Sequence, residues 1–335
     1  MSRMKAMVYE RYGAPDVLEL TEVSTPTPKD DEVLIEVRAT TVTSGDARLR
    51  AMNVPVGFGL LSRLAFGVFG PRRRILGVEV SGVVAAVGKK VTRFEVGAPV
   101  FALSGLRMGC HAEYCAIPEG GALATKPANL TFEEAAAMAF GGTTALDFFR
   151  RGELKSGEQI LVNGASGAVG TAAVQLAKHF GAHVTAVCST GNVGLVRSLG
   201  ADAVIDYTRE DFEEDGKLYD VIMDTVGTAP FSRSKRSLKK GGRLLLVLAG
   251  LPDMLGALWT NMTTDKKVVA GPAGERVEDL RLLAELAEAG KYRPVIDRSY
   301  PLERIAEAHA YVDTGRKKGN VVLTVGHGAA TEARA

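Results

Sequence analysis

Short runs of apolar and β-branched residues, separated by turn residues, fill the chain up to about residue 120. Such runs occupy 33–42, 77–88 and 98–103, and apolar and polar positions alternate along part of the first. Alternation with a period of two is typical of strands that bury one face, and frequent turn residues favour antiparallel connections. The pattern predicts a strand-rich, partly antiparallel, barrel-like region.

A pattern of alternating strands and helices begins after about residue 130. The predicted strands cover 159–165, 183–190, 203–207, 219–227, 242–250 and 266–271, and the predicted helices between them include 168–181, 192–200 and 231–242. Strands and helices at this spacing form βαβ units, in which the strands are parallel. The predicted fold class is therefore α/β, with a doubly wound parallel sheet. Two amphipathic helices, 278–290 and 303–315, and a strand at 317–325 complete the pattern.

An apolar segment interrupts the strand-rich region between residues 51 and 75. Several large apolar side chains lie between Phe58 and Phe69, and three arginines follow at 72–74. One interpretation is a helix packed onto the first domain, and the other is a wall or lid of an apolar substrate cleft. The arginines are expected to form a solvated edge.

The length and composition indicate an ordinary globular protein of two domains. The chain has 335 residues, of which 46% are hydrophobic, and its formal net charge is only +2. Near-balanced charge argues against a nucleic-acid partner. No signal peptide and no run of about 20 unbroken apolar residues is present, so we expect no membrane partner. The three cysteines cannot build a disulfide framework, and free thiols favour a cytoplasmic location.

The strongest chemical motif is a glycine-rich turn between the strand at 159–165 and the helix at 168–181. Gly164, Gly167 and Gly170 recur every three residues. The first allows the tight turn, the second lets the backbone approach a pyrophosphate, and the third allows close packing of helix on strand. Free N–H groups at the helix N-terminus then stabilise the phosphate. The motif predicts a dinucleotide site.

The end of the next strand predicts which dinucleotide is bound. A site for NAD usually carries Asp or Glu there, whereas this chain has Ser189, Thr190 and Asn192. Hydroxyl and amide groups can bind a 2′-phosphate without the repulsion of a carboxylate, and Arg197 and Arg209 could supply positive charge. Ser189 and Thr190 could equally cap the following helix, and the two roles are compatible. The expected cofactor is NADPH.

Three stretches of the chain resemble a known family. The stretches at 164–182, 198–207 and 317–325 are similar to the medium-chain dehydrogenase/reductase superfamily, and most of all to its zinc-free, quinone oxidoreductase-like (zeta-crystallin-like) branch. The resemblance implies a GroES-like catalytic domain at 1–125, a Rossmann NADPH-binding domain at 126–271, and a return to the catalytic domain at 272–335. The active site would lie in the cleft between the domains.

The resemblance also implies roles for individual residues. Besides Gly164, Ala165, Gly167 and Gly170, the pyrophosphate would lie along Ser166, Ala168 and Val169. Ser189 would meet the 2′-phosphate, and Tyr207 would pack by the adenosine. Thr144 would lie near the nicotinamide ribose, and Ala249, Gly250 and Asn320 would border the nicotinamide.

The positions that bind zinc in metal-dependent relatives differ in this chain. A Cys-His-Thr-Asp stretch of those relatives corresponds to 43–46, and their Gly-His-Glu corresponds to Gly77, Val78 and Glu79. Cys110, His111 and Cys115 lack a fourth partner for a tetrahedral site. We expect no metal, and we expect Glu79 to be a structural carboxylate.

Without a metal, reduction of a quinone or an α,β-unsaturated carbonyl is the simplest chemistry, because the nicotinamide supplies the hydride. Ser44, Thr43 and Thr144 are the candidate hydroxyl donors to the resulting oxyanion. The expected substrate is a small apolar carbonyl or quinone. The alternatives are an enoyl-thioester reductase, an alcohol or ketone oxidoreductase, and a catalytically silent NADPH-binding sensor.

The strands at 242–250 and 266–271 are predicted to end the Rossmann sheet. The last strand then has one neighbour within the chain, and pairing with a second copy would satisfy its free edge. Met254, Leu255, Leu258 and Trp259, on the connecting segment, could be buried beside it. The expected assembly is a homodimer.

Overall fold

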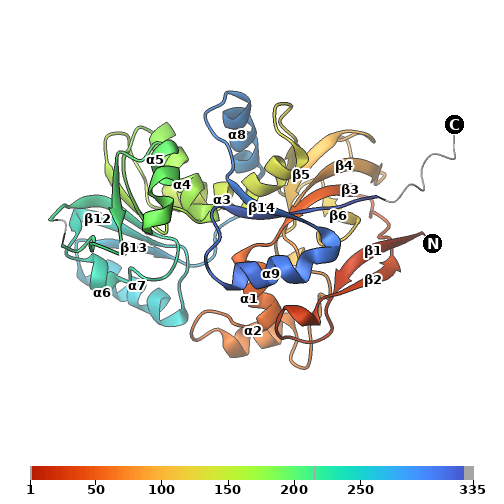
Figure 1. Cartoon of the computed structure of the whole chain (residues 1–335), viewed down its shortest axis with the longest axis horizontal. Coiled ribbons are helices and arrows are strands. Elements are labelled where there is room, and N and C mark those ends of the chain that lie inside the picture. Colours follow the sequence, from red (N-terminus) through yellow and green to blue (C-terminus); the bar gives the residue numbers. More distant parts are fainter. Residues whose placement is uncertain (1, 215, 328–335) are drawn as a thin grey trace.

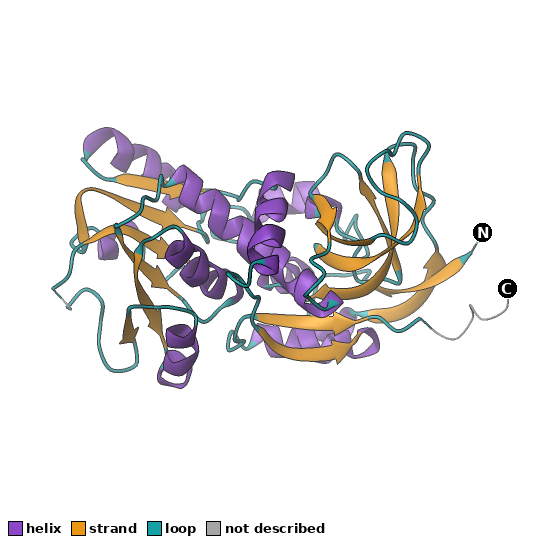
Figure 2. Cartoon of the chain, turned by 90° about the horizontal axis from the view of Figure 1, so that it is seen from above, coloured by secondary structure: helices purple, strands orange, loops and turns teal. Residues whose placement is uncertain are grey.

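Two large β-sheets organise the chain, and the long helix α3 lies between them (Figures 1 and 2). The computed structural model describes residues 2–214 and 216–327. Figure 2 shows strands gathered toward opposite ends of the molecule with helices between them. The helices are α1 (Ser44–Ala51), α2 (Gly59–Phe66), α3 (Phe132–Arg151), α4 (Ala168–His179), α5 (Val193–Ser198), α6 (Phe231–Ser234), α7 (Leu251–Thr263), α8 (Val277–Glu288) and α9 (Ile305–Asp313).

The six-stranded sheet is parallel throughout, as the strand–helix pattern predicted. Its strands lie in the order β10 (Ala203–Asp206), β9 (His183–Cys188), β8 (Gln159–Asn163), β11 (Tyr219–Asp224), β12 (Leu238–Leu246) and β13 (Lys267–Ala270). The chain winds outward from β8 in both directions, so the order reverses beside β8. In doubly wound sheets a ligand binds at this reversal, outside the carboxyl ends of the strands.

Alternating side chains cover both faces of this sheet. Ile160 and Val162 of β8 belong to the core that contains residues of α3, α4 and α8, whereas Leu161 belongs to a core with Ala257 of α7. Strand residues point to opposite faces in turn, so an unbroken apolar run buries both. This explains why β8 has no polar alternation in its sequence.

The second sheet is the strand-rich region predicted near the start of the chain. Its strands lie in the order β14 (Ile296–Pro301), β15 (Asn320–Thr324), β3 (Glu32–Thr41), β4 (Glu79–Val87), β5 (Pro99–Leu103) and β7 (Leu123–Thr125), and β6 (Tyr114–Pro118) also pairs with β3. All pairs are antiparallel except β14 with β15. A separate pair joins β1 (Arg3–Val8) to β2 (Glu19–Ser24). The last strands of the chain thus complete a sheet begun by the first.

Two predicted elements differ in the structure. The helix expected over 231–242 ends at Ser234, and β12 already begins at Leu238. Lys239 and Lys240 therefore lie in a strand and not in a last helical turn. The strand expected from residue 317 begins at Asn320, because Gly319 adopts a φ of +64° that closes a turn before it.

The segment 51–75 contains the helix α2, which is only partly packed on the first domain. Phe66 packs against the core of that domain and Ser62 is buried, whereas Leu60, Leu61 and Leu64 are 72%, 55% and 53% exposed. The packed-helix interpretation therefore holds for one end of α2 and is wrong for its three leucines. Among the described residues, no helix combines the length and apolar composition that crossing a bilayer requires.

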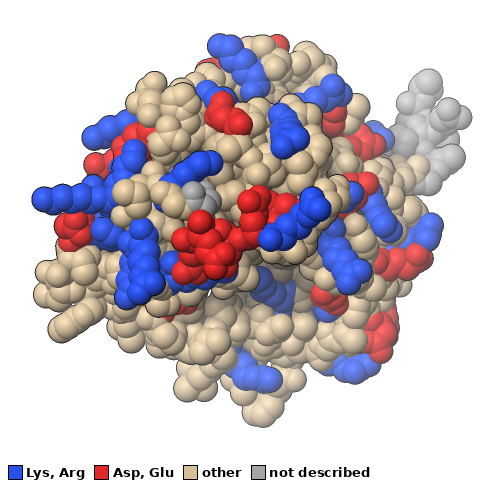
Figure 3. Space-filling view, turned by 60° about the vertical axis from the view of Figure 1, so that its left-hand side comes forward, with Lys and Arg blue, Asp and Glu red and all other residues tan. Residues whose placement is uncertain are grey.

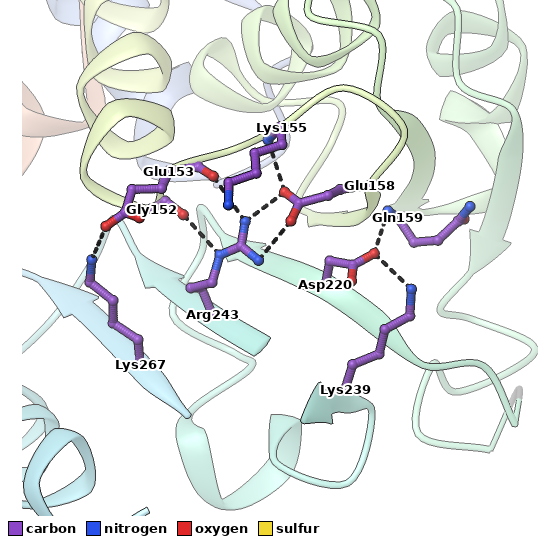
Figure 4. A network of polar contacts seen from close by, with 9 residues as sticks. All are labelled: Gly152, Glu153, Lys155, Glu158, Gln159, Asp220, Lys239, Arg243 and Lys267. Carbon is purple, nitrogen blue, oxygen red and sulfur yellow. Dashed lines mark hydrogen bonds and ion pairs between the residues drawn. The ribbon is translucent and has the colours of Figure 1, made fainter. Parts of the chain in front are cut away.

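A network of ion pairs joins the amino ends of the parallel strands (Figure 4). Arg243 of β12 binds Glu158 at 2.5 Å and the carbonyl oxygens of Gly152 and Glu153. Lys267 of β13 binds Glu153 at 2.9 Å. Because Arg243 and Glu158 are largely buried, this network is less screened by solvent than an isolated surface pair. The network therefore lies at the amino ends of the strands, on the opposite edge of the sheet from their carboxyl ends.

Candidate functional site: a dinucleotide cavity at the carboxyl edge of the parallel sheet

A cavity of about 800 Å³ lies at the carboxyl ends of β8, β9, β10 and β11. Its walls come from the loops after these strands, from α6, and from the turn between α9 and β15. The lining residues are Asn163, Gly164, Ser166, Gly167, Val187, Cys188, Ser189, Gly191, Asn192, Tyr207, Glu210, Asp211, Phe212, Val226, Thr228, Arg233, Gly315, Arg316, Lys317 and Lys318. This is the place at which doubly wound sheets bind dinucleotides.

The glycine-rich loop forms the floor of the cavity, and each glycine has a different reason to be there. Gly164 has a φ of +78°, which only glycine adopts without strain. A Cβ on Gly170 would lie 2.1 Å from the carbonyl oxygen of Gly164, so helix and loop touch there. A Cβ on Gly167 would meet only the Gly164 oxygen, at 3.5 Å, and would project where the cavity begins. The cradle is shaped so that a side chain at Gly167 would fill it.

Gly167 has an ordinary backbone conformation, unlike Gly164. Its φ is −79°, so it needs no left-handed conformation, and the positive φ of the loop belongs to Gly164. Gly167 is the N-cap of α4, and no capping side chain accepts a hydrogen bond from the first backbone N–H groups of this helix. Those groups are free to bind a phosphate.

The turn before β15 closes the cavity against the glycine loop. The N–H of Gly319 donates to the carbonyl oxygen of Ser166 at 2.8 Å, and Gly167 and Gly319 form an isolated parallel bridge. The side chain of Asn320 is buried and donates to the carbonyl oxygen of Val295 at 3.1 Å. The turn thus carries residues of the second sheet to the edge of the first.

At the end of β9, Ser189 and Asn192 line the cavity but Thr190 does not. The side-chain amide of Asn192 donates to the hydroxyl oxygens of Ser166, at 3.0 Å, and Ser189, at 3.2 Å. Thr190 instead donates to Asp206 at 2.6 Å. Neither Ser189 nor Thr190 makes a helix-capping hydrogen bond, so the capping alternative has no support at these side chains.

The cations at the cavity are not those that the sequence suggested. Arg197 and Arg209 do not line it, whereas Arg316, Lys317 and Lys318 do. Arg233 also lines it but is held by Asp211 and Glu213, each at 2.6 Å. The three consecutive cations of the turn are therefore the source of positive charge that the sequence analysis missed. The sequence could have indicated these cations, because they lie just before Asn320, which was already a candidate cofactor residue.

A buried carboxylate and a buried lysine lie near this turn. Burial raises the pKa of Glu79 to about 7 although Thr41 and the backbone N–H of Phe140 donate to it. Burial lowers the pKa of Lys317 to about 8, against the attraction of Glu79. The ammonium of Lys317 donates to the carbonyl oxygen of Gly319 at 2.7 Å. Glu79 of β4 thus accepts hydrogen bonds from β3 and α3, and its negative charge partly offsets the lowering of the pKa of Lys317 in the turn before β15.

The three candidate hydroxyl donors have different surroundings. Thr43 is the N-cap of α1, and its hydroxyl is engaged by Asp46 at 2.5 Å. Ser44, the first residue of α1, is exposed, and its hydroxyl has no partner among the described residues. Thr144 is buried in α3 and does not line the cavity. Ser44 does not line the cavity either, but it is the candidate whose hydroxyl is available.

The other residues singled out in the sequence are divided between the glycine loop, the cavity wall and the start of α7, and Ala249 and Gly250 do not line the cavity. Ala165 is buried, and Ala168 and Val169 form the first turn of α4. Gly141 of α3 brings that helix against the carbonyl oxygen of Ala168, where a Cβ would approach to 2.7 Å. Tyr207 lines the cavity with 63% of its surface exposed. Ala249 and Gly250 precede α7, and Gly250 is its N-cap.

The segments 43–46 and 77–79 lie side by side, but ordinary hydrogen bonds connect them. Asp46 accepts from the N–H of Gly77 at 3.0 Å and from Thr43. Within residues 2–214 and 216–327, no three His, Cys, Asp or Glu side chains are grouped to hold a metal ion. Cys110 and Cys115 are buried free thiols.

Comparison with known families assigns both parts of the chain. Residues 29–128 match the family described as alcohol dehydrogenase GroES-like domain, and residues 199–323 match the family described as zinc-binding dehydrogenase. The first range contains the strand-rich region, and the second contains the turn at 315–319.

Individual relatives cover nearly the whole chain. The chain is 37% identical to a 2-methylene-furan-3-one reductase of Solanum lycopersicum and 35% identical to an NADPH-dependent alkenal/one oxidoreductase, chloroplastic, of Arabidopsis thaliana. Each alignment covers 96% of this chain and 79% of the relative. The solved structure of a quinone oxidoreductase from Coxiella burnetii superposes with a TM-score of 0.86 at 28% identity, covering 97% of this chain and 100% of that one.

Proposed function

Because the chain belongs to the medium-chain dehydrogenase/reductase superfamily as a quinone oxidoreductase-like member, we propose that it reduces enones or quinones with NADPH. The observation that carries the proposal is the glycine cradle at the reversal of the parallel sheet, in a chain similar over its length to enone and quinone reductases. The geometry of the cradle and its free N–H groups fit a pyrophosphate.

The residues of the chain have three tasks in this reaction. When bound, the nicotinamide supplies the hydride. The loop 164–170 holds the pyrophosphate through backbone N–H groups, and the turn 316–318 adds positive charge. Ser44 donates a hydrogen bond to the oxygen of the substrate that gains negative charge, which lowers the barrier of the transfer. Thr43 and Asp46 fix the start of α1 and so orient Ser44.

The test is a comparison of substrates. NADPH oxidation is followed with a quinone, an α,β-unsaturated ketone, an enoyl-thioester of coenzyme A and a saturated ketone under the same conditions. We expect turnover of the quinone or the unsaturated ketone. Preference for the enoyl-thioester or the saturated ketone would assign the protein to one of those two reductase classes. NADPH binding without turnover of any substrate would indicate a sensor.

NADPH as the preferred nicotinamide is part of the same proposal. The support is that Ser189, without a carboxylate, directly follows β9, and that Asp206, the acid at the end of β10, is held by two threonine hydroxyls. Ser189→Asp should lower kcat/KM for NADPH by roughly 10- to 100-fold, because a carboxylate repels the 2′-phosphate. Ser198→Asp, at an exposed position outside the cavity, is the matched control. Wild-type protein that uses NADH as well as NADPH would refute this preference.

A homodimer through the edge formed by β13 and α7 is a further part of the proposal. As predicted, β13 pairs only with β12 among the described strands. The side chain of Asn261 already bonds the N–H and the carbonyl oxygen of Val268, so the exposed Leu258 and Trp259 of α7 would form the contact. Sedimentation at micromolar concentration should show twice the chain mass, and Leu258→Ser with Trp259→Ser should shift it to one chain. A single-chain species of the wild type would refute the dimer, and a dimer that the double substitution leaves intact would refute this interface.

Independence from zinc also belongs to the proposal, because 43–46 and 77–79 offer hydrogen bonds and not a set of ligands. Elemental analysis of protein purified without added metal should find far less than one zinc per chain. One zinc per chain, lost together with activity on chelation, would refute it.

A further inference from the structure

Six large apolar side chains are exposed on the segment 56–69, which contains α2 and is called the crest below. They are Val56, Leu60, Leu61, Leu64, Val68 and Phe69. Phe69 is fully exposed, at 103% of its reference surface, and Ser62 is the only buried residue of α2. Singly exposed apolar residues are common, but a contiguous group of them marks an interaction surface.

Positive charge follows the crest along the chain. Arginine is the only charged residue type between Asp46 and Glu79, a stretch that includes the whole crest. Arg74 binds Glu10 at 2.9 Å, and Arg63 lies over the ring of Tyr12. Arg72 and Arg73 are exposed and form no ion pair with any described residue, so these two arginines are available to a partner.

These observations distinguish between two kinds of partner. In a dimer with twofold symmetry the same patch meets itself, so the arginines of two copies would face one another without acidic groups between them. An anionic lipid surface supplies negative charge for every arginine and an apolar interior for the leucines and Phe69. Charge complementarity thus favours the lipid surface over a second copy.

The position of the crest in the molecule is compatible with contact to a flat surface. α2 and α7 lie at the lower edge of the molecule in Figure 1, and in Figure 3 that lower edge is mostly free of charged side chains. The segment before α2 contacts the start of α7, where the N–H of Leu251 donates to the carbonyl oxygen of Val56 at 2.9 Å. Arg63 lies in α2 and the arginines 72–74 follow it in the chain, whereas α7 contains no Lys or Arg.

We propose that the crest 56–69 and the arginines 72–74 dock the protein reversibly onto membranes that contain anionic lipids. The contact is peripheral, with the apolar side chains entering the interfacial layer and the arginines binding lipid headgroups. This replaces the expectation that the chain has no membrane partner and that 72–74 is only a solvated edge. The surface follows α1, which carries Ser44, so docking would hold the substrate side of the protein close to a source of apolar quinones or enones.

The test is flotation of the full chain with vesicles. Binding is measured to vesicles of phosphatidylcholine alone and to vesicles of phosphatidylcholine mixed with phosphatidylglycerol, at low and high salt. We expect binding to the mixed vesicles, weakened at least about tenfold when phosphatidylglycerol is omitted or salt is raised. A triple substitution, Leu60→Ser with Leu64→Ser and Phe69→Ser, should reduce binding at least about tenfold. Arg72→Glu with Arg73→Glu should do the same and remove most of the salt dependence.

The matched control lies outside the crest and outside α7. Val96→Ser with Leu106→Ser replaces two apolar side chains that are 66% and 77% exposed, and it should leave vesicle binding unchanged. Circular dichroism and melting of each variant confirm that it is folded. Absence of binding to mixed vesicles would overturn the proposal, and so would loss of binding in the variant of Val96 and Leu106 alone. A crest variant that splits a dimer while keeping vesicle binding would show that the crest contacts a second copy. NADPH turnover measured without vesicles keeps this test separate from the proposed reaction.

Discussion

The glycine loop at 163–170 and the segment at 43–75, which contains the proposed hydroxyl donor, differ in what their residues contribute. The loop offers backbone atoms, so the residue types at 164, 167 and 170 are dictated by space and by φ. The segment offers side chains, and adjacent residues of similar chemistry have different surroundings there. Thr43 is held by Asp46, whereas Ser44 is free. The comparison teaches that a site made of backbone can be recognised from a motif, and that a site made of side chains needs their neighbours.

The largest expected effect is a loss of NADPH affinity at the glycine loop without a loss of stability. Gly167→Val should weaken NADPH binding by at least about 100-fold, because the side chain fills the space of the pyrophosphate, while the free energy of unfolding changes by no more than about 1 kcal/mol. Fluorescence titration and urea unfolding measure the two quantities. Gly194→Val, at a position with no neighbouring atoms within 4 Å, is the control. Unchanged NADPH affinity in the folded variant would show that the phosphate lies elsewhere.

The next effect concerns Glu79, the buried carboxylate that accepts hydrogen bonds from Thr41 of β3 and from the N–H of Phe140 of α3. The pKa of Glu79 is raised from 4.5 to about 7, so the folded protein binds this proton more tightly than the unfolded chain. The stability from this group is complete below about pH 4.5 and is lost as the pH rises through 7, by on the order of 3 kcal/mol. Glu79→Gln should remove this component of the pH dependence, measured by urea unfolding between pH 5 and 8.

Two comparisons make the Glu79 experiment specific. Glu288→Gln, at an exposed glutamate, should keep the pH dependence of the wild type. The lowered pKa of Lys317, about 8, acts in a different window, because it costs stability as the pH falls from 10.5 through 8. Identical slopes for wild type and Glu79→Gln between pH 5 and 7 would contradict the assignment.

A smaller effect tests the contact between loop and helix. Gly170→Ala should lower the free energy of unfolding by roughly 2–3 kcal/mol, because the new methyl group meets backbone atoms that cannot move aside. Gly256→Ala on α7 has no neighbouring atoms within 4 Å, and should stabilise slightly through helix propensity. Thermal or urea unfolding compares the two. Equal stabilities would mean that the close packing at Gly170 is incorrect.

The smallest effect tests the substrate side. Ser44→Ala should lower kcat roughly tenfold and leave NADPH affinity unchanged, because one hydrogen bond to the developing oxyanion is lost. Thr43→Ala should instead lower stability by about 1 kcal/mol through loss of the helix cap. Steady-state kinetics with the best quinone or enone, together with unfolding, distinguishes them. If Thr43→Ala lowers kcat and Ser44→Ala does not, the roles of the two hydroxyls are reversed.

Much of the fold followed from local patterns. The period-two and strand–helix patterns predicted the two kinds of sheet, and the last strand was correctly placed at the edge as β13. The helix at 231–242 was too long, because basic residues typical of a last helical turn also suit the exposed face of β12. The exposure of α2 was not predictable, because an apolar helix has the same sequence pattern whether it packs on its own domain or on something else.

By itself the sequence determined the α/β class, the glycine loop and its position after β8, because each depends on residue types within a few positions of one another. The tertiary structure alone decided which cations reach the cavity and which hydroxyl is free. Gly319 bonds to Ser166, and Glu79 acts on Lys317, although these partners are far apart in the chain. No local spacing encodes such contacts, because they depend on how two separately formed sheets pack around α3.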